Sequence, residues 1–117
     1  MKYLFLEYPK CSTCRKAKKW LEEKGVEFQD RNIVEDNPNK GELMKWYKES
    51  SLPLKKFFNT SGNLYKELKL KDKLMEMTEE EQLELLATNG MLVKRPLIIG
   101  DNKILVGFKE EEWNSLI

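Results

Sequence analysis

The sequence contains no histidine, although 21 Lys and Arg and 20 Asp and Glu residues stand among its 117 positions. That absence excludes Ser–His–Asp triads, Cys–His nucleophilic pairs and every metal site built on imidazole. Long apolar runs are also missing, since no stretch reaches the roughly 18 apolar residues of a membrane span. The apolar start is interrupted by Glu7 too early for a secretory signal. We therefore expect a cytoplasmic protein with no membrane partner.

Strong net charge is missing too, because the formal net charge is +1. A nearly neutral chain offers no general attraction to nucleic acid or anionic lipid. The basic run from Lys10 to Lys19 resembles a nucleic-acid stripe, but exposed helix faces carry such charges for solubility, and acidic residues follow at once. We therefore expect no direct nucleic-acid partner. A chain of this length should form one domain, residues 1–117.

The chain has two cysteines, Cys11 and Cys14, within the stretch "YPKCSTCRKAKK". In a reducing compartment, such a close pair indicates catalysis, redox sensing or metal binding rather than a structural disulfide. The pair lies between a segment with the pattern of a strand and a segment with the pattern of a helix. Residues 2–8 predict a buried strand that ends at Pro9, and residues 12–24 predict an amphipathic helix. The cysteines should therefore lie where a strand passes into a helix.

The remaining pattern predicts an α/β fold. Residues 26–34 favour a second strand, and a strand, helix and strand in this length make a βαβ unit with parallel strands. Residues 97–99 and 104–107 flank a Gly-Asp-Asn turn, which is typical of a β-hairpin. Residues 110–117 should close the chain as a helix. Its apolar face is predicted to carry Trp113, Leu116 and Ile117.

Between these parts we predict a helical insert, approximately residues 36–92. Asn39 and Thr78 each stand three positions before a Glu and begin an apolar periodic segment, as N-terminal capping residues do. Further short helices are predicted at 52–58 and 64–70. No linker composition separates the insert from its flanks, so we expect it to pack on the sheet.

The position of Cys11 indicates chemistry. At a helix start, free backbone N–H groups and the positive end of the helix dipole stabilise an anion such as a thiolate. Lys10 and Arg15 add positive charge, so the pKa of Cys11 should fall below its free value of about 8.5. Cys14 lies one turn further along, partly covered, and could attack a sulfur adduct on Cys11 and close a disulfide. Cys11 is therefore predicted to attack and Cys14 to resolve.

Two other interpretations of the pair stay open. Free cysteine is among the most buried residue types, so both cysteines could be small core residues that happen to be neighbours. A zinc site formed by two chains, each giving two thiolates, is the second. The sequence has no other soft ligand for it, and we expect neither a metal nor a resident cofactor.

Arg95 and Pro96 form the second notable feature. A proline at a strand start cannot donate to the ladder, and proline is the residue that tolerates a cis peptide. Alone, the pair could equally be a helix stop beside a surface charge. A cis proline facing a redox cysteine is, however, a known arrangement on the thioredoxin scaffold, so the CxxC pair at the strand-to-helix junction gives the cis interpretation of Pro96 more weight. The candidate substrate-binding residues are Lys10, Ser12, Thr13, Arg15 and Pro96.

The segments "CSTCRKAKKWLEEKG", "LKKFFNTSGNLYKEL" and "GMLVKRPLI" resemble the arsenate reductase-related family that also contains the Spx redox regulators. The resemblance runs over nearly the full chain. It implies a thioredoxin-like α/β fold with a helical insertion, with Cys11 as the active cysteine and Arg95 beside it, before a cis Pro96. It also implies an external reductant, namely thioredoxin, glutaredoxin or glutathione.

The chain departs from the arsenate reductases of this family at several positions. Those enzymes surround the oxyanion with three arginines, of which only Arg95 is present, the others falling at Asn59 and Gly107. They usually carry a histidine at the position of Glu7 and no cysteine at Cys14. Because a charge-assisted donor contributes about 1.5 to 3 kcal/mol, two lost arginines lower the oxyanion affinity on the order of a thousandfold. The resemblance thus predicts weak arsenate reduction at most.

The Spx branch, in contrast, keeps a CxxC pair and a basic-Arg-Pro segment. Its members bind the C-terminal domain of the RNA polymerase α subunit through a glycine and an arginine, where this chain has Pro53 and Ser61. Two hypotheses follow from the resemblance. The first is a thiol–disulfide oxidoreductase that uses the CxxC pair, and the second is a redox-switched regulator that binds RNA polymerase.

Overall fold

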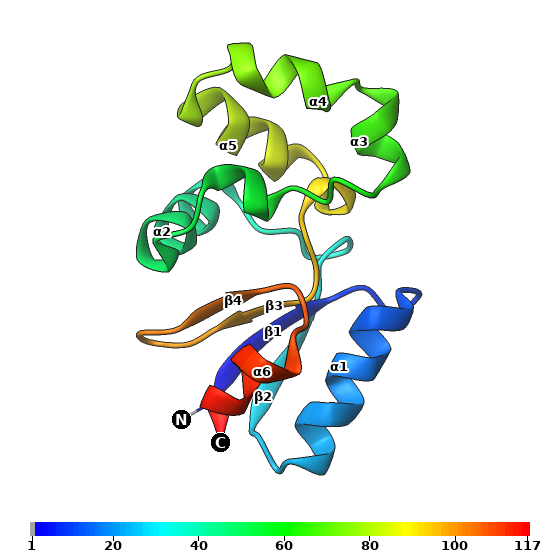
Figure 1. The fold of residues 1–117 in the computed structure, drawn as a ribbon, viewed down its shortest axis with the longest axis vertical. Helices are drawn as coiled ribbons and strands as arrows, with labels where there is room; N and C mark the ends of the chain where they lie inside the picture. The colour runs from blue at the N-terminus through cyan, green and yellow to red at the C-terminus, as the bar shows by residue number, and fades with distance from the viewer. Residues whose placement is uncertain (1) are drawn as a thin grey trace.

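The computed structural model describes residues 2–117 and is built on a four-stranded sheet of order β2-β1-β3-β4. The strands are β1 (Tyr3–Glu7), β2 (Phe28–Asn32), β3 (Leu97–Ile99) and β4 (Ile104–Val106). β1 pairs with β2 in parallel and with β3 in antiparallel register, and β3 pairs with β4 as a hairpin. The predicted βαβ unit and hairpin therefore form one sheet (Figure 1).

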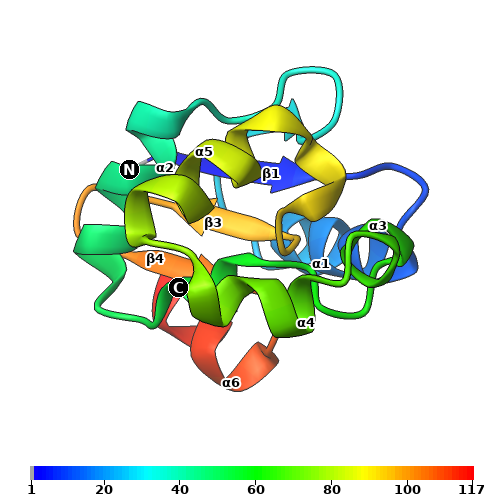
Figure 2. The same cartoon turned by 90° about the horizontal axis from the view of Figure 1, so that it is seen from above.

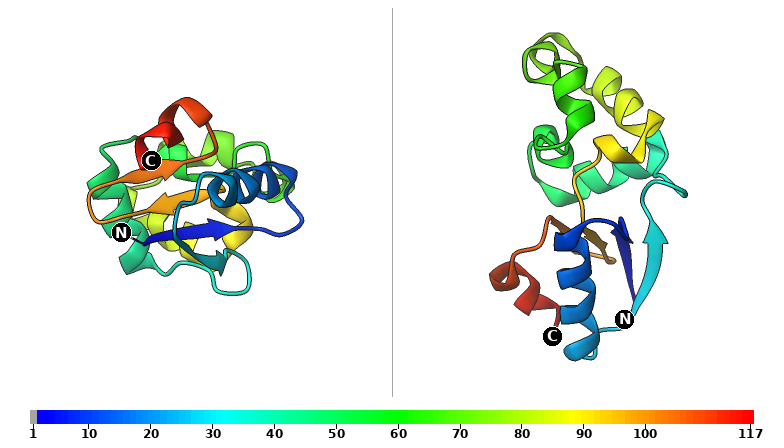
Figure 3. Two further views of the ribbon diagram at one scale, coloured as in Figure 1. Left: turned by 90° about the horizontal axis from the view of Figure 1, so that it is seen from below. Right: turned by 90° about the vertical axis from the view of Figure 1, so that its right-hand side faces the viewer.

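Helices cover both faces of this sheet. One face packs against α1 (Ser12–Glu23) and α6 (Glu110–Trp113), which continues as a 3₁₀ turn over Asn114–Leu116. The other face packs against the insert, which lies above the sheet in Figure 1 and as a separate layer in the right-hand view of Figure 3. The insert consists of α2 (Lys40–Ser50), α3 (Asn63–Glu67), α4 (Leu70–Lys73) and α5 (Glu79–Thr88), with 3₁₀ turns at Leu54–Phe57, Leu74–Glu76 and Gly90–Leu92.

The sheet separates two hydrophobic cores, because successive strand residues point to opposite faces. Phe5 packs with Trp20 and Trp113 under α1 and α6. Leu6, the next residue, packs in the larger core beneath the insert, with Phe57 among its members. β1 is thus buried from both sides, and its carboxyl end is held firmly where α1 begins.

The predicted capping residues begin the two longest insert helices. The side chain of Asn39 accepts a hydrogen bond from the backbone of Glu42, whose carboxylate accepts one from Asn39, and Thr78 makes the same reciprocal pair. The carboxylate of Glu42 also forms an ion pair with the guanidinium of Arg31 on β2, with 2.8 Å between Oε2 and Nη1. This ion pair links the insert to the sheet. At the far end of the insert, a Cβ on Gly90 would overlap the carbonyl oxygen of Ile33, so this close approach requires glycine.

Several predicted boundaries were wrong. The strand predicted at 26–34 ends at Asn32, because the Asn32 side chain accepts the backbone N–H groups of the next turn. The helix predicted at 52–58 is a 3₁₀ turn that starts after Pro53. The helix predicted at 64–70 is divided by Lys69, whose φ is 55°.

The end of the chain differs from its prediction in two respects, since the helix predicted at 110–117 ends at Trp113 and Ile117 is not buried. Trp113 is fully buried, and its indole N–H donates to the carbonyl of Gly107 at 3.0 Å. Ile117, predicted on the same buried face, is 66% exposed, because the last turn is a 3₁₀ turn rather than a continued α-helix. Among residues 2–117, no helix combines the length and apolarity that crossing a bilayer requires.

Candidate active site

Cys11 is the residue directly before α1, in an extended conformation with φ −90° and ψ 121°. Its backbone N–H donates to the carbonyl of Tyr8 at 2.9 Å, and its carbonyl accepts from the N–H of Arg15 at 3.1 Å. α1 has 12 residues, and its first turn contains neither a capping side chain nor an acidic residue. The N–H groups of that turn therefore face no competing anion beside the Cys11 sulfur.

The pKa of the Cys11 thiol lies below its ordinary value. Partial burial raises this pKa, but hydrogen bonds from the backbone amide and thiol of Cys14 lower it. The charge of Arg95 and the backbone amide of Thr13 lower it further, and the net direction is downward. Cys11 is half-buried, so the thiolate that these groups favour is still accessible to a reagent.

Cys14 has the opposite character. Its side chain is 0% exposed, and burial is the largest cause that raises the pKa of its thiol to about 12. A hydrogen bond from the backbone of Tyr8 to the sulfur opposes that rise without cancelling it. We predicted that Cys14 would be only partly covered, but the core packing of α1 seals it completely. The pKa values of the two thiols are therefore shifted in opposite directions although the residues are one helical turn apart.

Arg95 lies beside these thiols with unused hydrogen-bonding capacity. The peptide bond between Arg95 and Pro96 is cis, as the resemblance implies. The guanidinium carbon stands 5.3 Å from the centroid of the Tyr8 ring. One terminal nitrogen reaches the carbonyl of Met91 at 3.5 Å, whereas Nε is buried and has no partner among residues 2–117. A ligand can therefore be held by this guanidinium without first displacing a strong internal ion pair.

A hollow of about 350 Å³ adjoins Arg95. Its lining consists of Asn59, Ser61, Gly62, Asn63, Leu64, Met91 and Arg95. Figure 2 shows α3 above the beginning of α1, so the insert forms one wall of this region. Asn59 and Gly107 are the two positions where the arsenate reductases of this family have arginine. Asn59 lines the same hollow as Arg95. The backbone N–H of Gly107 donates to the carbonyl of Pro96 at 2.8 Å. The hollow thus offers one cation and several neutral donors.

The predicted substrate-binding residues differ in their exposure to solvent. They are Lys10, Ser12, Thr13, Arg15 and Pro96. The first four are exposed at the turn before α1 or in its first turn, whereas Pro96 is buried just before β3. We predicted that Lys10 and Arg15 would supply the positive charge near Cys11, but the charge that lowers its pKa comes from Arg95. Their part in substrate binding stays a prediction.

The burial of Glu7 was not predicted from the sequence. Glu7 is 4% exposed at the end of β1. Burial is the largest cause that raises the pKa of its carboxyl group, and the charge of Asp30 adds to this. The alternation of β1 was the available signal, since Glu7 must face the same side as the core residue Phe5.

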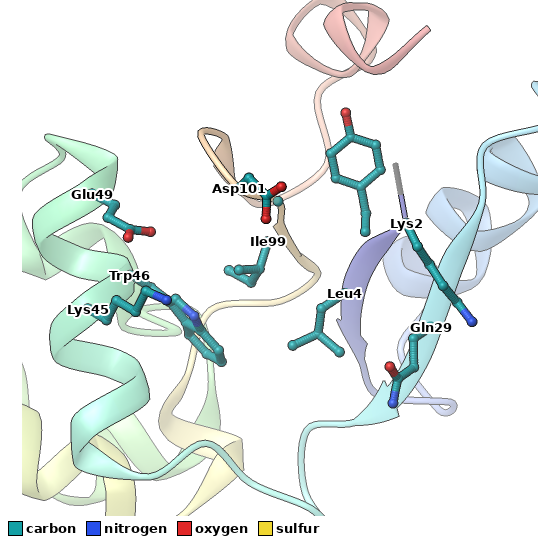
Figure 4. Close-up of a pocket in the computed structure, with 10 residues that line it drawn as sticks. Lys2, Leu4, Gln29, Lys45, Trp46, Glu49, Ile99 and Asp101 are labelled. Carbon is teal, nitrogen blue, oxygen red and sulfur yellow. The ribbon is translucent and has the colours of Figure 1, made fainter.

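A second hollow of about 330 Å³ lies at the other end of the sheet, between β1, the hairpin turn and α2 (Figure 4). Leu4 and Ile99 form its apolar floor, and Trp46 of α2 lies against one side. None of the predicted catalytic or substrate-binding residues lines it. The candidate chemistry is therefore concentrated at the carboxyl end of β1.

A parallel β1–α1–β2 unit, an antiparallel hairpin after a cis proline, and a CxxC pair at the first helix define a thioredoxin-like protein with a helical insertion. More narrowly, the chain belongs to the ArsC family, whose model matches residues 6–116. YusI from Bacillus subtilis is 58% identical over 98% of both chains. The global transcriptional regulator Spx from Streptococcus pyogenes is 30% identical and matches 97% of this chain and 83% of its own.

The family likeness extends to solved structures. A protein from Bacteroides fragilis described as related to the ArsC family superposes with a TM-score of 0.97 and 63% sequence identity. The match covers 100% of this chain and 98% of that one. Members of this family thus include chains with the same fold along their whole length.

Proposed function

We propose that this protein is a thiol–disulfide oxidoreductase of the reducing cytoplasm, in which Cys11 attacks and Cys14 resolves. The observation that supports this most strongly is the contrast between the two thiols: Cys11 is accessible directly before α1 and its pKa is lowered, whereas Cys14 is fully buried and burial raises its pKa to about 12. An accessible thiol with a lowered pKa is the better nucleophile and attacks the substrate first. A buried thiol with a raised pKa reacts only after an adduct has formed on its neighbour.

The proposed reaction has two steps. Cys11 thiolate attacks one sulfur of a substrate disulfide, which forms a mixed disulfide and releases the other sulfur as a thiolate. Cys14 then loses its proton and attacks the Cys11 sulfur, which closes the internal disulfide and releases the substrate's remaining thiolate. The substrate is thereby reduced by two electrons and the protein oxidised by two. An external thiol system, thioredoxin, glutaredoxin or glutathione, returns the protein to its dithiol form.

Arg95 would steady the negative charge near Cys11 during the attack, because its Nε has no other partner in the described chain. A single guanidinium suits a singly charged or neutral sulfur substrate better than arsenate, which needs several charge-assisted donors. We therefore propose arsenate as a weak substrate only.

A coupled assay tests this function. The protein is mixed with NADPH, a thioredoxin or glutaredoxin system and a small disulfide, and absorbance at 340 nm is followed. Sustained oxidation of NADPH is expected for the wild type and none for Cys11→Ser. Cys14→Ser should accumulate a mixed disulfide that mass spectrometry detects. A Cys14→Ser protein that traps nothing would show that the resolving role is wrong.

The second candidate function is a redox switch in a regulator, and the similarity to Spx is the observation that favours it. Here the internal disulfide would form once and change a binding surface, with no turnover. The residues Pro53 and Ser61, which replace the glycine and arginine of the polymerase contact, are both exposed. Stoichiometric oxidation without NADPH turnover, together with capture of the polymerase α C-terminal domain only in one redox state, would favour the switch.

A further inference from the structure

Charge is distributed unevenly along the chain, although the formal net charge is +1. Three segments meet at the candidate site: residues 8–21 contain both cysteines, residues 85–100 contain Arg95, and residues 50–66 supply most of the lining of the hollow beside it. These segments contain ten of the 21 Lys and Arg residues and none of the 20 Asp and Glu residues. The region around Cys11 is therefore basic in a nearly neutral molecule.

The cations that stand on the amino-terminal part of α1, on α3 and directly before Pro96 form the basic surface of the site. They are Lys10, Arg15, Lys16, Lys19, Lys66, Lys94 and Arg95. Among residues 2–117, only Lys19 of this set forms an ion pair, with Glu23 at 3.9 Å. The other six have no carboxylate to neutralise them. Charges that serve only solubility need not share one sign, whereas these do.

Part of the basic surface is a row along α1. The buried side of α1 consists of Cys14, Ala17, Trp20 and Leu21. Lys16 and Lys19 lie on its exposed side, four and seven positions after Ser12, the residue that follows Cys11. Because a helix rises about 1.5 Å per residue, this row extends roughly 10 Å along α1. A small disulfide covers only the surroundings of Cys11, so a row of this length suits a protein partner.

The charge at the centre of the basic surface changes with the redox state of the cysteines. In the reduced protein, the lowered pKa of Cys11 increases the fraction of its thiol that is a negatively charged thiolate. In an internal disulfide, both sulfurs are neutral. The surface is therefore more positive after oxidation, and an acidic partner binds the oxidised form better. A reductant needs this order, because it must find the disulfide and leave once the disulfide is reduced.

We propose that the basic surface is the docking site for the protein that reduces the Cys11–Cys14 disulfide, and that this partner presents an acidic surface around its own dithiol. This assignment rests on the proposed function, since it applies only if the internal disulfide forms. Nucleic acid and anionic lipid are also attracted by positive charge, but neither carries a thiol that would use the sulfur at the centre of the surface.

The reduction itself has two steps. A partner thiolate attacks the Cys11 sulfur, which forms a mixed disulfide and releases Cys14 as a thiolate that takes up a proton. The second partner thiol then loses its proton and attacks the partner's own sulfur in the mixed disulfide, and Cys11 leaves as a thiolate. The partner is oxidised by two electrons and this protein is reduced by two.

The test compares two reductants of the oxidised protein. One is a reduced thioredoxin whose net charge is negative, and the other is dithiothreitol, which carries no charge apart from that of its reacting thiolate. Reactions are stopped with acid, and free thiols are alkylated and counted by mass spectrometry. The rate constant for thioredoxin should fall about tenfold from roughly 10 mM to 1 M salt, over which the Debye length falls from about 30 Å to 3 Å. The rate constant for dithiothreitol should change much less.

Charge reversal on two elements locates the surface. Lys16→Glu on α1 and Lys66→Glu on α3, which lies above the beginning of α1 in Figure 2, should each slow thioredoxin at low salt. The double variant should be slowed about tenfold, the lower end of electrostatic steering, with the dithiothreitol rate unchanged. The matched control is Lys45→Glu, an exposed position on α2 at the other hollow, which should behave as the wild type.

The outcomes separate the docking site from the proposed function. If an oxidant does not join Cys11 to Cys14, the proposed function itself fails. If the disulfide forms and dithiothreitol reduces it, three results overturn the docking site alone. They are a thioredoxin rate that does not depend on salt or does not exceed that of dithiothreitol, a control variant Lys45→Glu as slow as Lys16→Glu, and a DNA duplex or an anionic lipid vesicle that binds both redox forms equally at roughly 0.15 M salt.

Discussion

Replacing Asn59 by arginine should restore part of an oxyanion site. Asn59 and Arg95 line the same hollow, so a second guanidinium at this position can reach a ligand held by the first. The backbone N–H of Asn59 donates to Leu92 at 2.7 Å, and that bond does not depend on the side chain. One added charge-assisted hydrogen bond contributes about 1.5 to 3 kcal/mol. Because 1.4 kcal/mol is about tenfold in affinity, arsenate should bind roughly 10 to 100 times more tightly.

The assay measures how arsenate protects Cys11 from iodoacetamide at neutral pH, from which an apparent Kd follows for each variant. Gln29→Arg is the matched control, since it adds the same charge on the exposed strand β2. If Asn59→Arg protects Cys11 no better than Gln29→Arg, the hollow is not the oxyanion position. Gly107 is a poor alternative site, because its φ of 80° disfavours any side chain.

Three further changes have predictable effects on stability. Trp113→Phe leaves the buried carbonyl of Gly107 without its 3.0 Å indole donor, which should cost about 1 to 3 kcal/mol in urea unfolding. Glu42→Gln should destabilise the protein at pH 7, because the bond to Arg31 holds the pKa of Glu42 below its usual value. That difference should disappear as pH falls through the lowered pKa, whereas unchanged thermal stability at pH 7 would contradict it. Glu7→Gln should raise the thermal midpoint at pH 7, since burial raises the pKa of Glu7 and its ionisation opposes folding. This gain should shrink at acidic pH, where Glu7 is protonated, and an equal gain at all pH values would refute the electrostatic cause.

The elements that the sequence predicts well are those with strong local signals. The apolar run ending at Pro9, the period of α1 and the capping pairs at Asn39 and Thr78 each determine structure within a few residues. The resemblance added the cis bond before Pro96, which local pattern alone left open. Cys11 was placed at the start of a helix for the same reason, since the change from strand to helix period is visible in the sequence.

The features that the sequence could not supply depend on contacts between distant segments. Lys69 interrupts an otherwise helical stretch because its left-handed backbone lets α3 and α4 turn over the core. A lysine is not a residue type that predicts a left-handed conformation. The charge near Cys11 comes from Arg95 at the other end of the chain, whereas sequence proximity pointed to Lys10 and Arg15. The burial of Glu7 at the end of β1 likewise depends on α1, which covers that face of the strand.

The position of β1 in the middle of the sheet has a consequence for protein synthesis. β1 lies between β2, which follows soon in the chain, and β3, which is translated near the end. While the ribosome is still adding the insert, the nascent chain lacks both β3 and the guanidinium that favours the thiolate. The central strand of the sheet and the full set of groups that lower the pKa of Cys11 are therefore complete only when the last segment of the chain has been added.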